Sequence, residues 1–320
     1  MVKAEALSKH FPGHHAVRGV SFEVRAGEIL GFLGPNGAGK TTTMRMLTGF
    51  LPPSGGRAWV GGHDVAVDPV AARRGLGYLP ENSPAYGEMT VEAFLAFTAE
   101  ARGMGRGERL HRVNAVVERC FLEGVRRQTI ETLSKGFRQR TCLAQAILHD
   151  PAVLIMDEPT DGLDPNQKAV VRRMIREMGR NKAIILSTHV LEEVDAICSR
   201  VVIISAGRIV ADDTPANLRR RSRHWQEVRL EVDAPASEAV AAFRGLPGVK
   251  DVVVEADADG RSAVCVRPAK GRPVLLAVLD AARARGWTPA EVRVDAGRLD
   301  DVFRRLTESA DVTGKARAAS

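Results

Sequence analysis

The sequence predicts an α/β fold with an antiparallel β subdomain and an inserted helical subdomain, followed by a small α+β domain. Three observations predict it. A glycine-rich turn at residues 34–39 separates an apolar run from a helical segment. Further apolar runs of strand length at 152–156 and 183–187 each end in polar residues. Residues 227–294 alternate between strand and helix patterns in the order βαββαβ.

Composition is that of an ordinary soluble protein. The 320 residues are 44% apolar and 27% charged, which fits one large or two modest domains. The net charge of +7 suits a membrane surface or nucleic acid. However, that charge is spread along the chain, and its one tight arginine cluster, at 219–223, has no interleaved aromatic residues. We therefore expect no nucleic-acid partner.

The cysteines and the apolar runs indicate a cytosolic chain. Cys120, Cys142, Cys198 and Cys265 are far apart and match no zinc spacing, so we expect buried free thiols in a reducing compartment and no metal site among them. The N-terminus lacks an apolar signal core, and no apolar run approaches the ~18 residues of a membrane span. Any membrane role then needs a partner protein.

The first strands of the chain are expected to pack beside the main sheet. Residues 2–7 and 20–24 alternate between apolar and polar side chains, which predicts two antiparallel strands. Phe11 is expected in the loop between them. An aromatic side chain there either stacks on a purine ring or anchors the loop.

The glycine-rich turn has the spacing of a phosphate-binding loop. Residues 29–33 predict a buried strand, and residues 34–41 fit G-x-x-x-x-G-K-[ST]. The loop itself consists of Gly34, Pro35, Asn36, Gly37, Ala38 and Gly39. We expect its glycines to let consecutive N–H groups turn inward around phosphates, while a helix at 40–48 directs its positive end toward them.

The residues that follow the loop complete a nucleotide site. Lys40 is placed to reach the β- and γ-phosphates. The hydroxyl of Thr41 is placed to bind a bridging Mg²⁺, and Thr42 is a second candidate hydroxyl. The pattern therefore predicts a site for a nucleoside triphosphate with Mg²⁺.

Acids and a histidine follow the next two buried strands. The strand at 152–156 leads into Asp157 and Glu158, and the strand at 183–187 leads to His189. Because ligands bind at the carboxyl ends of strands in such sheets, these residues should converge on the phosphate loop. Asp157 then holds Mg²⁺ through water, Glu158 polarises the attacking water, and His189 donates to a γ-phosphate oxygen.

A helical subdomain is expected at about 85–150. Its two apolar stripes, separated by a glycine-rich break, are Val91, Phe94, Leu95, Phe97 and Thr98, then Leu110, Val113, Val116 and Val117. A further helix begins at 133–137, with Ser134 as its N-cap. This helix start is either a second anion site or an ordinary capped end.

In their order, these motifs resemble those of the ATP-binding subunits of ABC transporters. The resemblance covers a domain at 1–220, with Walker A at 34–42, the signature at 133–137, Walker B at 153–158 and His189 as the switch histidine. It implies a P-loop fold of ABC type and ATP and Mg²⁺ as cofactors.

The resemblance also assigns roles to residues that one chain alone leaves unexplained. Two copies sandwich two ATP molecules head to tail, so that the signature residues Ser134, Lys135 and Gly136 of one chain contact the γ-phosphate held by Lys40 of the other. The catalytic residues are then Glu158, His189 and Lys40. Phe11 corresponds to the aromatic residue that stacks on adenine, and residues 161–164 to the loop that links the two sites.

Two departures from the family pattern concern the same phosphates. Glu81 stands where the family usually has glutamine, and Lys135-Gly136-Phe137 replaces the commoner Gly-Gly-Gln. Glu81 is a candidate Mg²⁺ ligand beside Thr41 and Asp157. An extra carboxylate near phosphates adds repulsion, and we hypothesise that Lys135 offsets it.

The tail predicts a ferredoxin-like α+β domain at 225–310. An amphipathic helix at 299–307 closes it, and residues 311–320 are expected to be a disordered tail. A docking or dimer-stabilising role is favoured over ligand sensing, because no cluster of acids, histidines or cysteines suggests chemistry there. The expected strands are 227–232, 249–255, 262–267 and 290–294, and the expected helices are 237–243 and 273–285.

Residues 77–82 and 133–136 resemble the exporter branch whose ATPase and permease are separate chains, which includes gliding-motility-associated and multidrug-type subunits. The resemblance implies an ATPase on the inner face of the cell membrane. ATP binding closes a dimer, expected to consist of identical chains, and hydrolysis reopens it to drive a separate multi-span membrane permease.

Two other functions compete with transport. The first is a soluble ABC-type mechanochemical ATPase acting on ribosomes or nucleic acid. It is disfavoured because this chain has one Walker A motif and no sustained heptads. The second is a nucleotide-dependent regulatory module without turnover, which the presence of both Glu158 and His189 disfavours.

Overall fold

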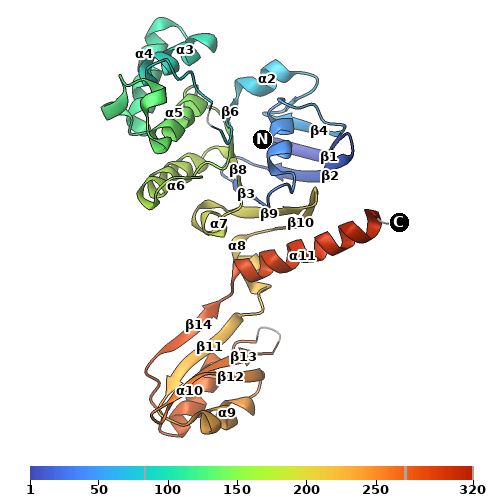
Figure 1. The fold of residues 1–320 in the computed structure, drawn as a ribbon, viewed down its shortest axis with the longest axis vertical. Helices are drawn as coiled ribbons and strands as arrows, with labels where there is room; N and C mark the ends of the chain where they lie inside the picture. Colours follow the sequence, from blue (N-terminus) through green and yellow to red (C-terminus); the bar gives the residue numbers. More distant parts are fainter. Residues whose placement is uncertain (83, 270–271, 319–320) are drawn as a thin grey trace. The chain divides into compact units, whose positions relative to one another are not determined.

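The computed structural model describes residues 1–82, 84–269 and 272–318, with side chains described as far as residue 308. The chain divides into two compact units (Figure 1). Unit 1 consists of residues 1–214 and 306–320, and unit 2 of residues 215–305. The boundary between Thr214 and Pro215 lies slightly before the expected domain limit at 220, because α8 (Pro215–Arg220) belongs to unit 2.

A six-stranded sheet forms the centre of unit 1, in the order β10-β9-β3-β8-β7-β6. All neighbours in it are parallel except β10, which is antiparallel to β9. Every residue of β3, β7 and β8 is buried, as their continuous apolar runs predict. The strands are β3 (Ile29–Leu33), β6 (Leu76–Leu79), β7 (Val153–Asp157), β8 (Ala183–Thr188), β9 (Arg200–Ser205) and β10 (Arg208–Asp213).

Side chains of the central strands alternate between two hydrophobic clusters. Ile184 and Leu186 pack with α6 (Pro165–Gly179) and α7 (Leu191–Ile197). Ile185, between them, packs in a second cluster with α1 (Lys40–Leu47) and the antiparallel sheet. Both faces of the sheet are therefore covered, and its ligands can approach only at the strand ends.

The predicted antiparallel subdomain is a four-stranded sheet in the order β2-β1-β4-β5. Its strands are β1 (Val2–Phe11), β2 (His14–Val24), β4 (Gly55–Val60) and β5 (His63–Asp64). β1 and β2 are longer than predicted, and Phe11 ends β1 rather than lying in a loop. The reason is the tight turn at Gly13, whose φ of 75° favours glycine and lets pairing continue to Phe11.

The helical subdomain contains α3 (Val91–Ala101), α4 (Arg106–Arg119) and α5 (Lys135–Ile147), drawn together in green in Figure 1. Most residues of the predicted stripes are buried, but Phe97 and Leu110 are 44% and 60% exposed. A helical stripe is buried only where another element covers it, and these two side chains are not covered. The ring of Phe97 instead packs edge-on against Tyr86, with centroids 5.6 Å apart.

Unit 2 has the predicted order of strands and helices, in an antiparallel sheet of order β12-β13-β11-β14. Val228, Leu230 and Val232 of β11 pack in one cluster with residues of α9 and α10. The elements are β11 (Trp225–Val232), α9 (Ala236–Arg244), β12 (Val249–Ala258), β13 (Arg261–Pro268), α10 (Leu275–Ala284) and β14 (Val292–Ala296).

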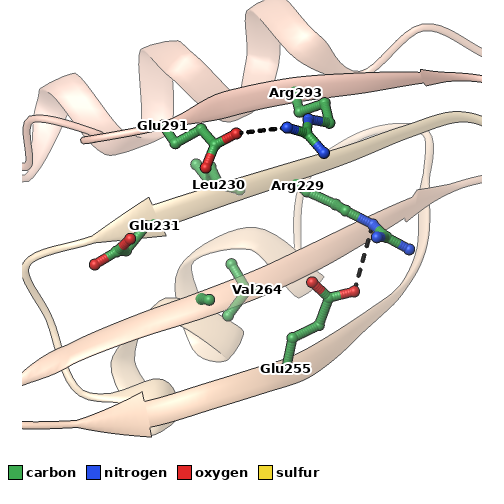
Figure 2. Close-up of a pocket in the computed structure, with 8 residues that line it drawn as sticks. Arg229, Leu230, Glu231, Glu255, Val264, Glu291 and Arg293 are labelled. Atoms are coloured by element: carbon green, nitrogen blue, oxygen red, sulfur yellow. Dashed lines mark ion pairs between the residues drawn. The ribbon is translucent and has the colours of Figure 1, made fainter.

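The same sheet carries a small charged hollow of about 180 Å³ (Figure 2). Arg229 pairs with Glu255 at 3.4 Å, and Arg293 pairs with Glu291 at 3.1 Å. Glu231 adds a further carboxylate to the lining. Because each arginine already faces an acid, the hollow has no preference for an anion.

The last helix, α11 (Leu299–Ala318), is longer than the predicted 299–307. Helix therefore replaces most of the tail expected to be disordered at 311–320, and residues 319–320 lie outside the described residues. The segment from 308 to 318 contains no proline and several strong helix formers, so nothing in it ends the helix at 307.

All four cysteines are free thiols; Cys198 is half-buried and the other three are buried. Within 1–82, 84–269 and 272–318, no helix is both long enough and apolar enough to cross a bilayer.

Candidate nucleotide-binding site

The loop between β3 and α1 owes its shape to glycines that serve two purposes. Gly37 and Gly39 have φ of 77° and 106°, which side chains with a Cβ rarely adopt. Gly34 differs from the expectation, since its φ is ordinary and a Cβ there would collide with the backbone oxygen of Ile204. Conformation therefore requires two of the glycines, whereas close packing requires Gly34.

Lys40 is buried at the first position of α1, with only 6% exposed. Its ammonium donates to the backbone oxygens of Gly34 at 2.8 Å and Pro35 at 3.3 Å. It also lies 3.8 Å from Oε1 of Glu158. Burial lowers the pKa of Lys40, although the nearby carboxylates oppose this. The loop thus holds a buried cation at the N-terminus of a helix, which is an environment that favours anions.

Asp157 ends β7 with a carboxylate that is only partly satisfied. The residue is 1% exposed, and Ser187 of β8, its partner in the strand register, donates a hydrogen bond to Oδ1. Oδ2 is buried and has no hydrogen-bond partner within the described part of the chain. A buried oxygen of this kind is costly unless a cation or a water binds it. Its chemistry therefore fits Mg²⁺ or a water on Mg²⁺.

Glu158 follows directly and is held in a strained conformation. Its φ of 50° is left-handed, which is uncommon for a residue other than glycine. Its N–H lies 3.2 Å from both the backbone oxygen and the hydroxyl of Ser187. Its Oε1 lies 3.0 Å from Nδ1 of His189. Burial raises the pKa of Glu158, while His189 and Lys40 oppose the rise, and a carboxylate with a raised pKa is a stronger base.

A hollow of about 430 Å³ adjoins these acids. It brings together four of the predicted site residues, Phe11, Thr42, Glu81 and Asp157, from four separate parts of the chain. Phe11 is 41% exposed, so its ring is accessible for stacking. Thr41, the second residue of α1, is partly buried.

The signature residues begin α5 and form a separate cluster. Ser134 caps the helix, and its hydroxyl accepts a hydrogen bond of 3.4 Å from the N–H of Phe137. The ammonium of Lys135 donates to Asp161 at 2.9 Å, and Gly136 lies against the side chain of Gln167. For the residues described, no hydrogen bond or ion pair joins this cluster to the phosphate loop of the same chain.

Two residues that shape the site were missed by the sequence reasoning. Ser187 was treated only as the end of a strand. It is the first of two hydroxyl residues that follow the apolar run at 183–186, and it pairs with Asp157 in the sheet. Gln139 of α5, which donates to the backbone oxygen of Pro159 at 3.2 Å, was not considered. Ser187 could have been found from the expected pairing of the two buried strands, whereas Gln139 carried no sequence signal.

Sequence comparison identifies known proteins that are similar to this chain. The sequence profile described as ABC transporter matches residues 17–161. The linearmycin resistance ATP-binding protein LnrL of Bacillus subtilis (strain 168) is 30% identical over 308 residues, which are 96% of this chain and 98% of that protein. The daunorubicin resistance ATP-binding protein DrrA3 of Streptomyces coeruleorubidus is 31% identical over 308 residues, 96% of this chain and 95% of that protein.

Among solved structures, the ATP-binding subunit of an ABC transporter superposes with a TM-score of 0.64 at 31% identity. The superposition covers 69% of this chain and 92% of the chain in that structure. The two resistance proteins, in contrast, match nearly the entire chain.

Proposed function

Because the chain belongs to the ABC transporter family, as an ATP-hydrolysing subunit of the exporter type, we propose that two copies of it close on two ATP molecules and drive a separate multi-span membrane permease. The observation that carries this proposal is the separation of two anion-favouring elements within one chain. Lys40 lies in the phosphate loop, whereas the capped start of α5 at Ser134 has no hydrogen bond to that loop among the described residues. A second copy supplies the missing half of each site.

The residues of the phosphate loop are suited to hold the triphosphate. Loop N–H groups and the Lys40 ammonium bind the phosphates, and Phe11 stacks on the base. Thr41, Asp157 and Glu81 are the candidate ligands of Mg²⁺ or of its waters. When bound, Mg²⁺ offsets the negative charge that the phosphates and these carboxylates share.

Hydrolysis depends on the pair formed by Glu158 and His189. Glu158 accepts a proton from the attacking water, since its burial raises the pKa of its carboxyl. The 3.0 Å contact with Nδ1 of His189 fixes the direction of that carboxylate. When both ring nitrogens of His189 carry a proton, the other nitrogen can donate to a γ-phosphate oxygen.

The permease contact is proposed at residues 81–89 and the aromatic hollow next to them. That hollow has a volume of about 510 Å³ and includes Phe50 and Tyr86, which are 73% and 59% exposed. Clustered exposed aromatic side chains mark protein contacts. The chain then works on the inner face of the membrane, attached through the permease. The names of the two resistance proteins support a drug-like cargo for that permease.

Turnover is tested with Glu158→Gln. The variant should bind ATP, accumulate as a closed dimer and hydrolyse ATP at least about 100-fold more slowly, because the base is lost. Phosphate release and size-exclusion chromatography with ATP measure these effects. Glu192→Gln, which changes an exposed carboxylate of α7, is the matched control. Hydrolysis by Glu158→Gln at the wild-type rate would show that Glu158 is not the base.

The transport assignment is tested by co-purification from detergent-solubilised membranes. A multi-span membrane protein should be retained by the wild-type chain. Replacing exposed rings that line only this hollow by alanine, in Tyr86→Ala with Phe97→Ala, should release it while ATP hydrolysis by the isolated chain continues. Retention of ribosomal or other soluble partners alone would favour the mechanochemical alternative.

A further inference from the structure

Lys135 extends across the loop that follows Glu158 of its own chain. Its ammonium donates to Oδ2 of Asp161 at 2.9 Å. The adjoining Gly162 has a φ of 64°, and a Cβ there would collide with the terminal atoms of the Lys135 side chain. The backbone conformation favours glycine at this position, and the absence of a Cβ leaves room for the lysine where it lies.

A second donor on the same face of α5 holds the same loop. Gln139 lies four residues after Lys135, one helical turn along, so the two side chains project from one face. Its amide donates to the backbone oxygen of Pro159 at 3.2 Å in a buried setting. The first turns of α5 therefore hold the loop by hydrogen bonds at Pro159 and at Asp161.

The segment that α5 holds in this way, residues 158–161, begins at Glu158. The N–H of Asp161 donates to the backbone oxygen of Glu158 at 3.1 Å, which closes a tight turn between them. Because Glu158 has an uncommon left-handed conformation, surrounding contacts must maintain it. A displacement of Asp161 is thus transmitted to the backbone that aims the Glu158 carboxylate.

We propose that Lys135 is a positioning residue for hydrolysis, which acts through Asp161 to hold Glu158 in place within its own chain. This rests on the proposed function of Glu158 as the base. It gives the signature lysine a role in cis, in place of the hypothesis that Lys135 offsets the charge of Glu81 at the nucleotide of a second copy.

The electrostatics of Asp161 agree with this geometry. The hydrogen bond from Lys135 is the main cause that holds the pKa of Asp161 below its usual value. The charges of Lys135, His189 and Lys168 act in the same direction, while burial opposes them. Asp161 is therefore ionised at neutral pH and keeps its attraction for the lysine.

The kinetic test compares the two partners. Lys135→Met should lower kcat by about two- to fivefold with an unchanged KM for ATP, because an exposed ion pair contributes modestly. Asp161→Asn should have the same effect, the double variant should lose no more, and Lys135→Arg should restore kcat. Lys168→Met, which removes a nearby positive charge without a hydrogen bond to Asp161, is the matched control and should behave as wild type.

A different outcome would assign Lys135 to the nucleotide. If Lys135→Met raises KM or weakens ATP-dependent dimerisation while Asp161→Asn behaves as wild type, the proposal is overturned.

A second measurement does not depend on hydrolysis. An NMR titration of the Asp161 carboxyl should show a higher pKa in Lys135→Met than in wild type, and equal pKa values would overturn the proposal. A wild-type chain that binds ATP without hydrolysing it would contradict the proposed function, while the titration would still decide whether Lys135 holds Asp161.

Discussion

At the residue scale, buried charge is concentrated at and after the carboxyl ends of β3 and β7. Lys40, Asp157 and Glu158 are each at most 9% exposed. A buried charge is costly unless other charges or hydrogen bonds offset it. Here the three offset one another only in part, since Asp157 keeps an unpartnered oxygen among the described residues. The site is therefore costly to the fold and suited to phosphates and a divalent cation.

Glu81 lines the same hollow as Asp157, and its proposed role as a metal ligand can be tested with Mg²⁺. Glu81→Gln should raise the Mg²⁺ concentration needed for half-maximal hydrolysis by roughly tenfold, because it removes a charged ligand or a partner of one. Hydrolysis measured across a Mg²⁺ titration gives the shift. Glu88→Gln, an exposed carboxylate of the same segment, should leave the profile unchanged. An unchanged profile for Glu81→Gln would exclude a metal role.

Much of the site could be predicted from sequence, because spacing alone determines the local geometry. The phosphate loop, Asp157, Glu158 and His189 all follow from residues that lie next to an apolar run. The contacts of Ser187 and Asp161 could not be predicted in this way. They depend on which strands pair and on which helix face meets a distant loop, and neither is encoded within a short segment.

At the element scale, the apolar residues on the helices of the helical subdomain are of two kinds, buried and exposed. The helical character of this subdomain follows from the periodicity of apolar residues, and the start of α5 follows from the predicted N-cap at Ser134. Periodicity does not reveal which turns are covered, and Phe97 and Leu110 of the two stripes are exposed. Packing between elements, and not propensity, decides burial at the ends of such stripes.

Substitutions to alanine in the two stripes should therefore have unequal effects. Leu95→Ala should lower the free energy of unfolding by about 2–5 kcal/mol, because the side chain is fully buried. Leu110→Ala should change it by less than about 0.5 kcal/mol. Chemical denaturation measures both. Equal losses would mean that Leu110 is covered in solution.

Another element-scale contact joins the turn after α5 to the start of β8. Lys182 donates to Oδ1 of Asp150 at 2.6 Å, and this hydrogen bond is the main cause that lowers the pKa of Asp150 below 3.8. A lowered pKa in the folded state means that the carboxylate stabilises the fold above its unfolded pKa and loses that effect as pH falls through the folded pKa.

The variant Asp150→Asn should therefore be less stable than wild type at neutral pH, by no more than about 1 kcal/mol because Asp150 is exposed. Asparagine tolerates the left-handed backbone found at this position, so the change isolates the charge. Thermal unfolding should show the difference closing at pH values well below 3.8. A difference that persists there would point to a cause other than ionisation.

At the scale of the whole molecule, the chain combines a second unit with a unit that contains every predicted site residue. All the predicted ATP contacts lie between Phe11 and His189. The order of elements in the second unit could be predicted from alternating patterns, whereas its function could not, because its paired surface charges indicate no particular ligand.

A chain truncated after Arg223 should bind ATP with unchanged affinity, since every predicted contact is retained. Self-association should weaken if the second unit stabilises the dimer, as we propose. Nucleotide titration and analytical ultracentrifugation separate the two effects. Normal dimerisation of the truncated chain would contradict the proposed role of this unit.

The central claim is that each ATP site is shared between two copies, and mixing two inactive variants tests it most directly. Lys40→Ala removes the phosphate-loop lysine, and Ser134→Arg blocks the start of α5. Each variant alone should hydrolyse almost no ATP. When they are mixed, each heterodimer should regain one intact site, built from Lys40 of one chain and Ser134 of the other, and hydrolysis should reappear. If the mixture stays as inactive as its components, although heterodimers form, the site is not shared and the account is wrong.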